Sequence, residues 1–231
     1  TMDGIAGARA DLAAAPSVDI ANGAPNGADA TNELLLNWSD ARDGLNHEKS
    51  LLSFSTDQGM TWSAPSAVSA SSDRPIYTAV AISPNGTDAY VTYDAFLAPY
   101  QSTTSAARPL QGVVTHADLS ATGTPGAFTE LHRGVSGDTR GSSQNDLTAE
   151  FLGDYVYAVA TRTYGAAVWN DTRNATDCPA IDHYRNFVEG SGPAAPKPAP
   201  NSDCPPGVGA DGPTFFGNSD IFGGSYADPT P

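Results

Sequence analysis

The octet Ser55-Thr56-Asp57-Gln58-Gly59-Met60-Thr61-Trp62 decides the fold class of this chain. Residues 51–54 form a β-prone run that enters the octet, so the octet is predicted to be the tip of a hairpin. Asp57 can accept hydrogen bonds from backbone N–H groups inside the turn, and Gly59 can adopt the positive φ that other residues resist. The octet therefore predicts a strand that turns back along its neighbour.

Side chains at both ends of the octet can fix the loop. Hydroxyls of Ser55 and Thr61 can close it, and Trp62 carries apolar surface back under the sheet. The pattern resembles the Asp-box, Ser-X-Asp-X-Gly-X-Thr-Trp, which joins the outer strands of blades in sialidase-like β-propellers, the BNR-repeat proteins. In that family the Asp-box lies on the outer rim, away from the substrate. The resemblance therefore implies a structural role for Ser55, Asp57, Gly59, Thr61 and Trp62.

The composition limits the classes of partner. The 231 residues carry a formal net charge of -15 at pH 7, and charged residues make up only 16%. A nucleic-acid or anionic-membrane surface needs a basic footprint, so neither partner is expected. No apolar run approaches the roughly 20 residues of a membrane helix, so no membrane span is expected. Plentiful Gly and Pro suit short strands joined by turns, in a single all-β domain over residues 1–231.

Two cysteines, Cys178 and Cys204, bracket the Pro-rich stretch 192–200 of the loop over residues 190–206. A disulfide between Cys178 and Cys204 would stabilise the fold by about 3 kcal/mol, because it restricts the unfolded chain. Such a bond fits an oxidising compartment, so we expect a secreted protein. The alternative is two free buried thiols; zinc is disfavoured because no local Cys/His pair accompanies them.

Hydrophobic runs and turn signals divide the chain into three units, which we expect to be antiparallel blades over residues 17–70, 74–133 and 147–222. The tail from residue 211 is expected to supply a final edge strand. The strands expected are 17–20, 33–38, 50–54 and 65–68 in the first unit, 77–82, 89–93, 112–117 and 128–132 in the second, and 155–160, 166–169 and 181–187 in the third.

An internal repeat supports this division. Residues 36–43 align with residues 167–174, which gives Trp-X-Asp-X-Arg twice at the end of a strand. Alternation along a strand puts each Asp and Arg on one face, where they can pair with each other or with the next blade. Because the pattern repeats, we expect it to hold blades together rather than to catalyse. Its members are Trp38, Asp40, Arg42, Trp169, Asp171 and Arg173.

The expected number of blades is too small for a closed ring. Ring closure usually takes at least four blades, and a sialidase-like ring has six, whereas about three are expected here. The chain is therefore expected to be the C-terminal part of a longer propeller protein whose N-terminal blades lie outside this sequence. The alternatives are completion of the ring by a second copy, and an open, sandwich-like stack.

The resemblance also extends to secreted actinobacterial exo-α-sialidase-like proteins, through segments that include residues 40–48, 141–143 and 150–158. In sialidases a tyrosine activated by a glutamate attacks the sugar, an aspartate is the acid/base, and three arginines bind the substrate carboxylate. Glu150 with Tyr155 or Tyr157 could imitate the glutamate–tyrosine pair. The alternative is that Asp154 caps a loop and Tyr155 packs between blades.

An anionic sugar must be met by locally placed arginines, because the chain as a whole is acidic. The candidates for substrate binding are Arg74, Arg140, Arg173 and, beside them, Asp154. The Phe/Tyr-Arg-Ile-Pro motif that occurs early in the family is absent, and residues 74–76, Arg-Pro-Ile, resemble it only superficially.

No cofactor or metal site is predicted. The four histidines lack metal-ligand spacing, so each is expected to be solvated or hydrogen-bonded. Two acidic loops offer oxygen ligands suited to calcium, although such residues more often bond the backbone of their own turns. These loops contain Asp43, Asn46 and Glu48 in one case and Asp171, Asn174 and Asp177 in the other.

The sequence predicts a portion of a secreted sialidase-like glycoside hydrolase that acts on sialylated or related acidic glycans. Catalytic turnover is not expected from the isolated chain. The alternative is a non-catalytic β-propeller that binds glycan or protein at the cell surface.

Overall fold

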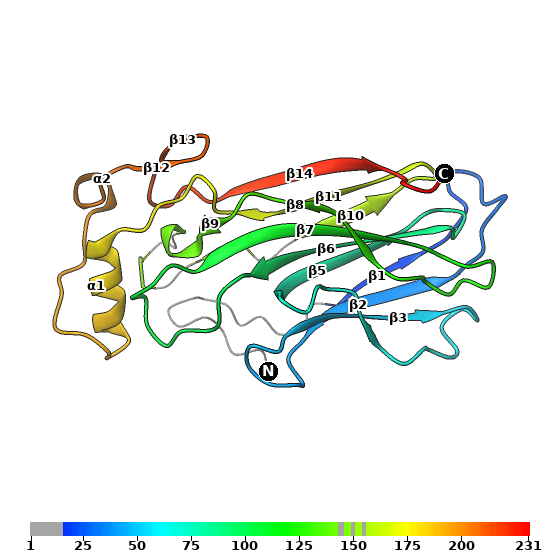
Figure 1. The fold of residues 1–231 in the computed structure, drawn as a ribbon, viewed down its shortest axis with the longest axis horizontal. Coiled ribbons are helices and arrows are strands. Elements are labelled where there is room, and N and C mark those ends of the chain that lie inside the picture. The colour runs from blue at the N-terminus through cyan, green and yellow to red at the C-terminus, as the bar shows by residue number, and fades with distance from the viewer. Residues whose placement is uncertain (1–15, 143–145, 149–150, 154–155) are drawn as a thin grey trace.

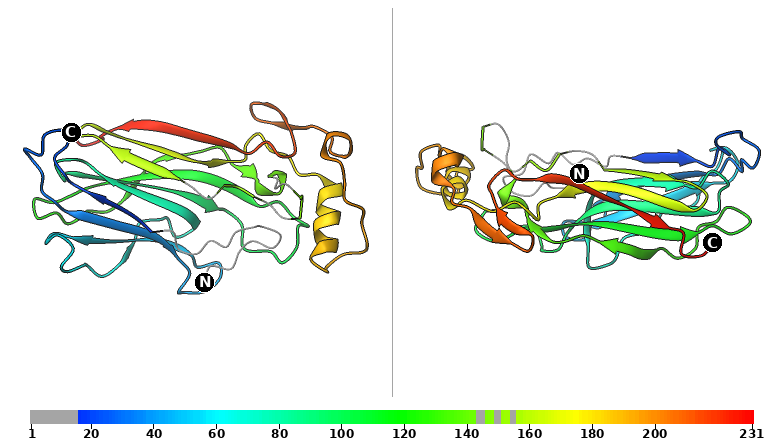
Figure 2. Two further views of the ribbon diagram at one scale, coloured as in Figure 1. Left: turned by 180° about the vertical axis from the view of Figure 1, so that it is seen from behind. Right: turned by 90° about the horizontal axis from the view of Figure 1, so that it is seen from above.

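The computed structural model describes residues 16–142, 146–148, 151–153 and 156–231. Three antiparallel sheets run along the long axis of the molecule, and helix α1 (Pro179–Val188) lies at the end opposite the C-terminus (Figure 1). Two further views show the same lengthwise arrangement of the strands (Figure 2). The prediction of a mainly β chain is confirmed; its sheets form no closed ring in the described part of the chain.

The first sheet is a four-stranded meander of β1 (Ser17–Ile20), β2 (Leu34–Asp40), β3 (Lys49–Ser55) and β4 (Ser66–Ala67). Burial alternates along β2, as expected for a strand with one face on the core. Leu35 and Asn37 are fully buried on that face. The Asn37 amide donates to the Ser50 hydroxyl at 2.9 Å and to the Leu51 carbonyl at 2.8 Å, so its burial leaves the polar group satisfied.

The octet of residues 55–62 forms the turn that follows β3. Asp57 accepts hydrogen bonds from the Ser55 hydroxyl at 2.8 Å, the Thr61 N–H at 2.8 Å and the Thr61 hydroxyl at 2.6 Å. Gly59 has a φ of 84°. Trp62 differs from expectation: it stays 42% exposed, and its indole N–H donates to the Gly59 carbonyl at 3.1 Å. The indole therefore covers the turn rather than filling the core.

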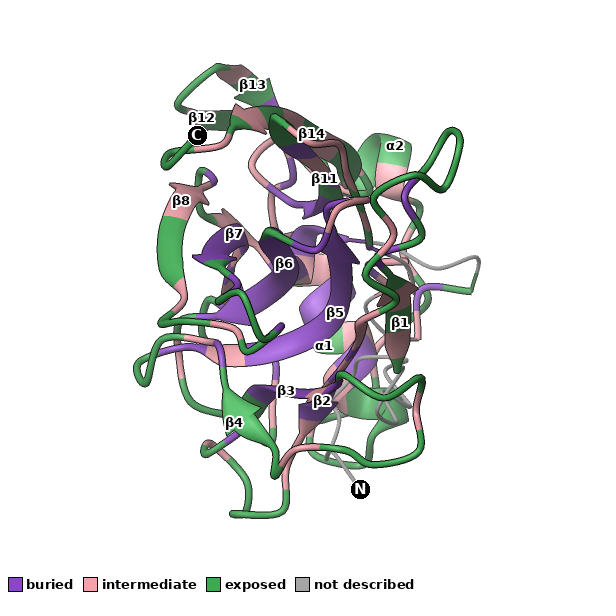
Figure 3. Cartoon of the chain, turned by 90° about the vertical axis from the view of Figure 1, so that its right-hand side faces the viewer, coloured by how far each residue is buried: buried purple, intermediate pink, exposed green. Residues whose placement is uncertain are grey.

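The second sheet lies at the centre of the fold. Its strands are β5 (Arg74–Ile82), β6 (Asp88–Phe96), β7 (Pro109–Asp118) and β8 (Thr129–Arg133), with the short β9 (Gly137–Asp138) beside β7. Every residue of β6 is buried, and β5, β6 and β7 form the buried centre of Figure 3. One apolar cluster joins this sheet to the first sheet and another joins it to the third, so both of its faces are covered.

The third sheet has three strands, β10 (Tyr157–Ala160), β11 (Tyr164–Asp171) and β14 (Asp220–Ala227). Strand β14 is the edge strand expected from the tail, and it extends past the expected limit of this unit at residue 222. Trp169 on β11 is buried against the second sheet and is 2% exposed. Gly112 makes room for it, because a Cβ there would lie 2.0 Å from the indole Cδ1.

The strand expected over residues 181–187 is wrong, because these residues form α1. Pro179 occupies the first turn, where its missing N–H costs nothing. Ile181 and Arg185 are four residues apart and both are fully buried, which is the spacing of one helical face rather than of a strand. Ile181, Tyr184 and Phe187 are three residues apart, a spacing that favours a helix and that the strand prediction did not take into account.

A disulfide joins Cys178, at the start of α1, to Cys204, which follows the short helix α2 (Pro200–Asp203). This agrees with the pairing suggested by the sequence. The remaining elements are the 3-10 helix η1 (Thr139–Gly141) and a hairpin of β12 (Gly207–Gly209) and β13 (Gly212–Thr214). None of the described helices is both long and apolar enough to cross a membrane.

Candidate functional site

The first strands of the three sheets border one groove of about 630 Å³, lined by β1, β5 and β10. Among the described residues that line it, Asp19 is the only charged one, and its carboxylate accepts the Ile82 N–H at 2.9 Å. Ser17 accepts the Val80 N–H at 3.2 Å in the same way. These bonds tie the edge of the first sheet to β5, so the groove has a fixed polar wall.

Tyr77 marks an irregularity in this groove that the sequence did not indicate. Its φ is 44°, and the pairing of β5 with β6 shifts between Ile76 and Thr78. A positive φ is strained for an aromatic residue, and bulges of this kind are common beside functional sites. Tyr77 is only 5% exposed, so the bulge shapes the groove wall mainly through the backbone.

The repeated Trp-X-Asp-X-Arg motif forms the same closed set of contacts twice. Arg42 donates to Asp40 through Nε at 2.8 Å and Nη2 at 2.8 Å, and the Trp38 indole donates to the same carboxylate at 3.0 Å. These contacts and the backbone N–H of Arg42 hold the pKa of Asp40 well below its usual range. Each motif therefore pairs within itself rather than with a neighbouring sheet.

The second copy of the motif is more buried. The guanidinium of Arg173 contacts Asp171 at 2.9 Å and 2.7 Å and lies over the Phe222 ring of β14, 3.9 Å from its centroid. Trp169 donates to Asp171 at 3.3 Å. Arg173 was a candidate for substrate binding, but in this structure its charge is engaged by Asp171.

Arg140 is also engaged. Its guanidinium lies 2.7 Å from Asp138, 3.2 Å from Asp177 and 3.5 Å from Asp182, and it donates to the Thr104 carbonyl at 3.1 Å. Burial raises the pKa of Asp182 to about 6, with the charges of Asp177 and Asp138 adding to the effect and those of Arg140 and Arg185 opposing it. Arg140 thus joins η1, α1 and the connecting loops.

We expect Asp182→Asn to stabilise the protein above pH 7. The pKa of Asp182 in the folded state is raised from 3.8 to about 6. The stability that the protonated carboxyl contributes is therefore fully present below pH 4 and is lost as the pH rises through 6. Asn cannot ionise, so the variant should gain about 1 kcal/mol over the wild type at pH 7.5 and lose this advantage near pH 3.5. Urea unfolding at both pH values measures this; a variant less stable at pH 7.5 would mean that the contact with Arg140 dominates.

Arg74, at the start of β5, differs from Arg140 and Arg173. It is half-buried, and Nη1 donates weakly to the Ser72 carbonyl at 3.5 Å. Its Nε is buried without a hydrogen-bond partner, and no carboxylate among the described residues forms an ion pair with it. Of the three candidate arginines, Arg74 is therefore the one whose charge is not already engaged by a carboxylate.

Strand register places the candidate arginines at one end of the molecule, the end that carries α1. Arg74 pairs with Phe96, Phe96 with Leu110, and the neighbouring Pro109 with Asp138, which precedes Arg140. Arg173 follows β11 at this end, where a Cβ on Gly137 would meet the carbonyl group of Thr172. The other three catalytic or binding candidates, Glu150, Asp154 and Tyr155, lie outside the described residues.

The two loops considered for calcium use their oxygens within the protein. Asp43 pairs with Lys49, Asn46 accepts the Tyr100 N–H at 2.6 Å, and Glu48 accepts the Asn46 N–H at 3.0 Å. In the other loop, Asp171 binds Arg173 and Asp177 binds Arg140. Asn174 donates from its amide to Asp220 at 3.2 Å. Three of these contacts are ion pairs, and Asn46 and Glu48 accept backbone N–H groups, as turn residues commonly do. The other carboxylate oxygen of Glu48, Oε2, is buried without a hydrogen-bond partner among the described residues.

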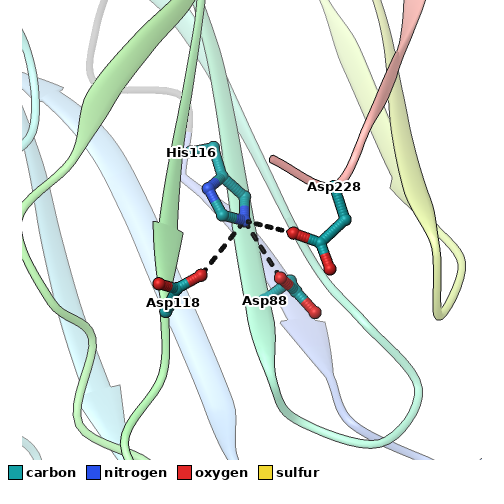
Figure 4. A group of neighbouring side chains, drawn as sticks. All are labelled: Asp88, His116, Asp118 and Asp228. Atoms are coloured by element: carbon teal, nitrogen blue, oxygen red, sulfur yellow. Dashed lines mark hydrogen bonds and ion pairs between the residues drawn. The ribbon is translucent and has the colours of Figure 1, made fainter. Parts of the chain in front are cut away.

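At the opposite end of the molecule, four side chains converge in a group that we call the Asp–His cluster (Figure 4). Nε2 of His116 lies 3.0 Å from Asp88, 3.9 Å from Asp118 and 4.0 Å from Asp228. The side chains of His116, Asp88 and Asp228 are 3%, 5% and 7% exposed, whereas Asp118 is 58% exposed. His116 is thus a buried, hydrogen-bonded histidine and not a solvated one.

The pairing of β6 with β7 brings together three of the four residues of the Asp–His cluster. Asp88 pairs with Asp118 across β6 and β7, and Tyr90 pairs with His116 two residues further on. Side chains two residues apart share a face of a sheet, so the sequence signal is Asp-X-Tyr on one strand opposite His-X-Asp on the next. Asp228 reaches the group from the end of β14, which no local pattern could indicate.

Tyr90 lies beside this cluster. Its ring centroid is 4.9 Å from that of His116, it is 1% exposed, and Gly165 of β11 packs against its ring. Its hydroxyl has no hydrogen-bond partner among the residues that the structure describes. Burial, with the charges of Asp88, Asp228 and Asp118, raises the pKa of Tyr90 well above its usual value.

Comparisons with known proteins assign no family. No model of a known protein family matches the sequence, and no curated protein matches it. Among solved structures, the chain is similar to the α-L-arabinofuranosidase Arb93A from Fusarium graminearum, determined in complex with an iminosugar inhibitor. The match has 18% identity and a TM-score of 0.32, and it covers 59% of this chain and 35% of that chain. The match therefore spans about a third of that protein's length.

Proposed function

We propose that this chain is a portion of a secreted sialidase-like β-propeller that acts on sialylated or related acidic glycans, and that the isolated chain binds glycan without hydrolysing it. One observation carries the proposal: β1, β5 and β10, the first strands of three successive sheets, border a single groove. The inner strands of neighbouring propeller blades meet in this way. The Asp-box turn joins β3 to β4, the two strands farthest from β1 in the first sheet, as an outer turn of a blade would.

Arg74 is the residue that we propose for binding the carboxylate of the sugar. It begins β5, three residues before Tyr77, where the groove lining on this strand starts, and no carboxylate among the described residues pairs with it. A guanidinium can bind a planar carboxylate through two hydrogen bonds, which is why arginine suits this ligand better than lysine. A chain as acidic as this one would otherwise repel an anionic sugar.

A non-catalytic binding propeller is the second candidate, and the contacts of Arg140 and Arg173 favour it. Both guanidinium groups are held by carboxylates at 2.7 Å, so neither is free to complete a three-arginine clamp. Removing either arginine from its carboxylate would leave a mostly buried charge without its partner, which is costly. The two candidates differ in whether a longer form of the protein turns over a sialoside.

Binding of sialyllactose and of neutral lactose to the chain tests the proposal, by isothermal titration calorimetry at low ionic strength. We expect sialyllactose to bind and lactose to bind at least tenfold more weakly. Arg74→Ala should weaken sialyllactose binding at least tenfold. The matched control is Arg42→Ala, because Arg42 is 58% exposed and held by Asp40. Equal binding of both sugars, or an Arg74→Ala variant that binds normally, would refute the carboxylate-binding role.

Turnover of a fluorogenic sialoside separates the two candidates. We expect none from this chain alone. Activity in a longer form that is lost in folded Glu150→Gln and Tyr155→Phe variants would support the hydrolase. A folded, inactive longer form that still binds sialyllactose would support the binding propeller.

A further inference from the structure

We propose that the Asp–His cluster binds one divalent transition-metal ion, for which Zn²⁺ is the best-matched probe. The cluster lies at the end of the molecule opposite α1 and the candidate arginines, so this proposal is independent of the glycan-binding proposal. Each of its four residues offers one ligand atom: Asp88, His116, Asp118 and Asp228.

The spacing of the ligand atoms suits a small ion. All four atoms lie within 4.8 Å of one another, and Nε2 of His116 is 3.0, 3.9 and 4.0 Å from the three carboxylate oxygens. Ligands that surround Zn²⁺ tetrahedrally at about 2.0–2.2 Å are roughly 3.4 Å apart. The observed separations bracket this value, so small side-chain shifts would complete the coordination.

The ligand types favour a transition metal over calcium. An imidazole nitrogen suits Zn²⁺ and its neighbours in the first transition series, whereas calcium takes 6–8 oxygen ligands. The cluster supplies one nitrogen and three carboxylates, which is a mixed set of the kind that zinc accepts.

The charges of the cluster are poorly balanced without a cation. Asp88 and Asp228 are buried carboxylates, and among the described residues no lysine or arginine forms an ion pair with them or with Asp118. Hydroxyl and backbone donors do help, since Thr87 donates to Asp88 at 2.5 Å and the Thr230 N–H donates to Asp228 at 2.8 Å. Three carboxylates, two of them buried, still surround one imidazole, and buried negative charge without a cation is unfavourable.

The hydroxyl of Tyr90 is a second and independent indication. It is a buried polar group without a hydrogen-bond partner among the described residues, on a ring that packs against His116. Tyr90 pairs with His116 in the register of β6 and β7 and lies on the same sheet face as Asp88, two residues before it. Buried polar groups are rarely left unsatisfied, and water bound to a metal in the cluster would supply the missing partner.

Metal binding would connect two sheets. Asp88, His116 and Asp118 belong to β6 and β7 of the second sheet, whereas Asp228 directly follows β14 of the third sheet. Thr230 already reaches Asp118 across the same gap through its hydroxyl. An ion held by both sheets binds only the folded chain, so it should raise the thermal stability.

Titration of chelator-treated chain tests the proposal, with Zn²⁺ measured against a chromophoric zinc indicator and with Mn²⁺ and Ca²⁺ in parallel. We expect one equivalent of Zn²⁺ to bind, to raise the melting temperature, and to bind at least tenfold more tightly than Ca²⁺. Co²⁺ in place of Zn²⁺ should give visible absorption bands typical of mixed nitrogen and oxygen ligands.

Two variants decide which residues bind the ion. Asp118→Asn changes an exposed ligand and should leave the fold intact, and Asp228→Asn changes the ligand from the third sheet. Each should weaken Zn²⁺ binding at least tenfold and reduce the shift in melting temperature. The matched controls are Asp220→Asn, an exposed carboxylate at the start of β14, and His183→Gln, an exposed histidine on α1; both should bind Zn²⁺ normally.

Two results would overturn the proposal. In one, the folded wild type takes up no stoichiometric Zn²⁺, which would mean that His116 serves as a hydrogen-bonded partner of Asp88 alone. In the other, Asp118→Asn and Asp228→Asn bind Zn²⁺ as tightly as the wild type while His183→Gln does not, which would place the ion on the surface. Circular dichroism of each variant establishes that it is folded.

Discussion

Trp169→Ala is expected to lower the free energy of unfolding by about 3–5 kcal/mol, the range for removing a buried aromatic side chain. Trp169 is 2% exposed, fills the space above Gly112, and lies 5.4 Å from the His132 ring, centroid to centroid. Its removal would leave a cavity between the second and third sheets and take a hydrogen bond away from Asp171. Urea unfolding followed by circular dichroism measures the change.

Trp38→Ala is the matched control, because it removes the tryptophan of the first copy of the same motif. Trp38 is half-buried and donates to Asp40 in the same way. The smaller loss of buried area predicts a cost of about 1–2 kcal/mol. Equal costs for the two variants would show that the hydrogen bond to the aspartate, and not the packing of the indole, determines the contribution.

Removal of the disulfide with Cys178→Ser and Cys204→Ser together is expected to cost about 3–4 kcal/mol. The two cysteines are 26 residues apart, and loss of a bond that closes a loop of this length allows the unfolded chain many more conformations. Urea unfolding of the double variant and of the wild type, each with and without dithiothreitol, measures the effect.

The control for this prediction is contained in the same experiment. Dithiothreitol should lower the unfolding midpoint of the wild type and leave that of the double variant unchanged. A wild-type midpoint that does not respond to the reductant after the bond is shown to be reduced would contradict the prediction. It would mean that α1 and the 190–206 loop unfold separately from the sheets.

The first two sheets could be predicted from the sequence because their signals are local. Residues 33–38 contain three consecutive leucines and a tryptophan, the octet 55–62 marks a turn, and residues 77–82 and 112–117 are rich in apolar and β-branched residues, as strands are. The structure has β2, β5 and β7 at the three predicted strands and a turn at the octet. The residues that determine each of these strands and turns are close together in the sequence, so each element could be predicted from its own segment.

Helix α1 could not be predicted in the same way. Its residues mix polar and apolar types, and Arg185 is buried although it is charged. The guanidinium is satisfied by the carbonyls of Leu147, Arg140 and Ser142 at 3.0–3.2 Å. These acceptors come from segments about 40 residues away, so the burial of Arg185 depends on tertiary contacts that a pattern does not contain.

In the candidate site, too, contacts within one segment could be predicted and contacts between distant segments could not. The pairing of Asp40 with Arg42 follows from alternation along one strand, and it was among the expected contacts. The engagement of Arg140 by Asp177 and Asp182 depends on where α1 packs. Register across two strands and the path of β14 build the Asp–His cluster, and neither can be read without the sheet pairing.

The place of β14 in the third sheet has a consequence for the order of folding during synthesis. The ribosome releases β10 and β11 as a hairpin, but their third partner is made only after α1, the disulfide loop and the β12–β13 hairpin. Two-stranded hairpins are marginally stable alone, and the ring of Phe222, which covers Arg173, arrives with β14. The nascent chain should therefore hold two finished sheets and one unfinished sheet until residue 227 emerges, and until then the apolar cluster around Trp169 lacks Phe222 and Tyr226 and offers apolar surface to a chaperone.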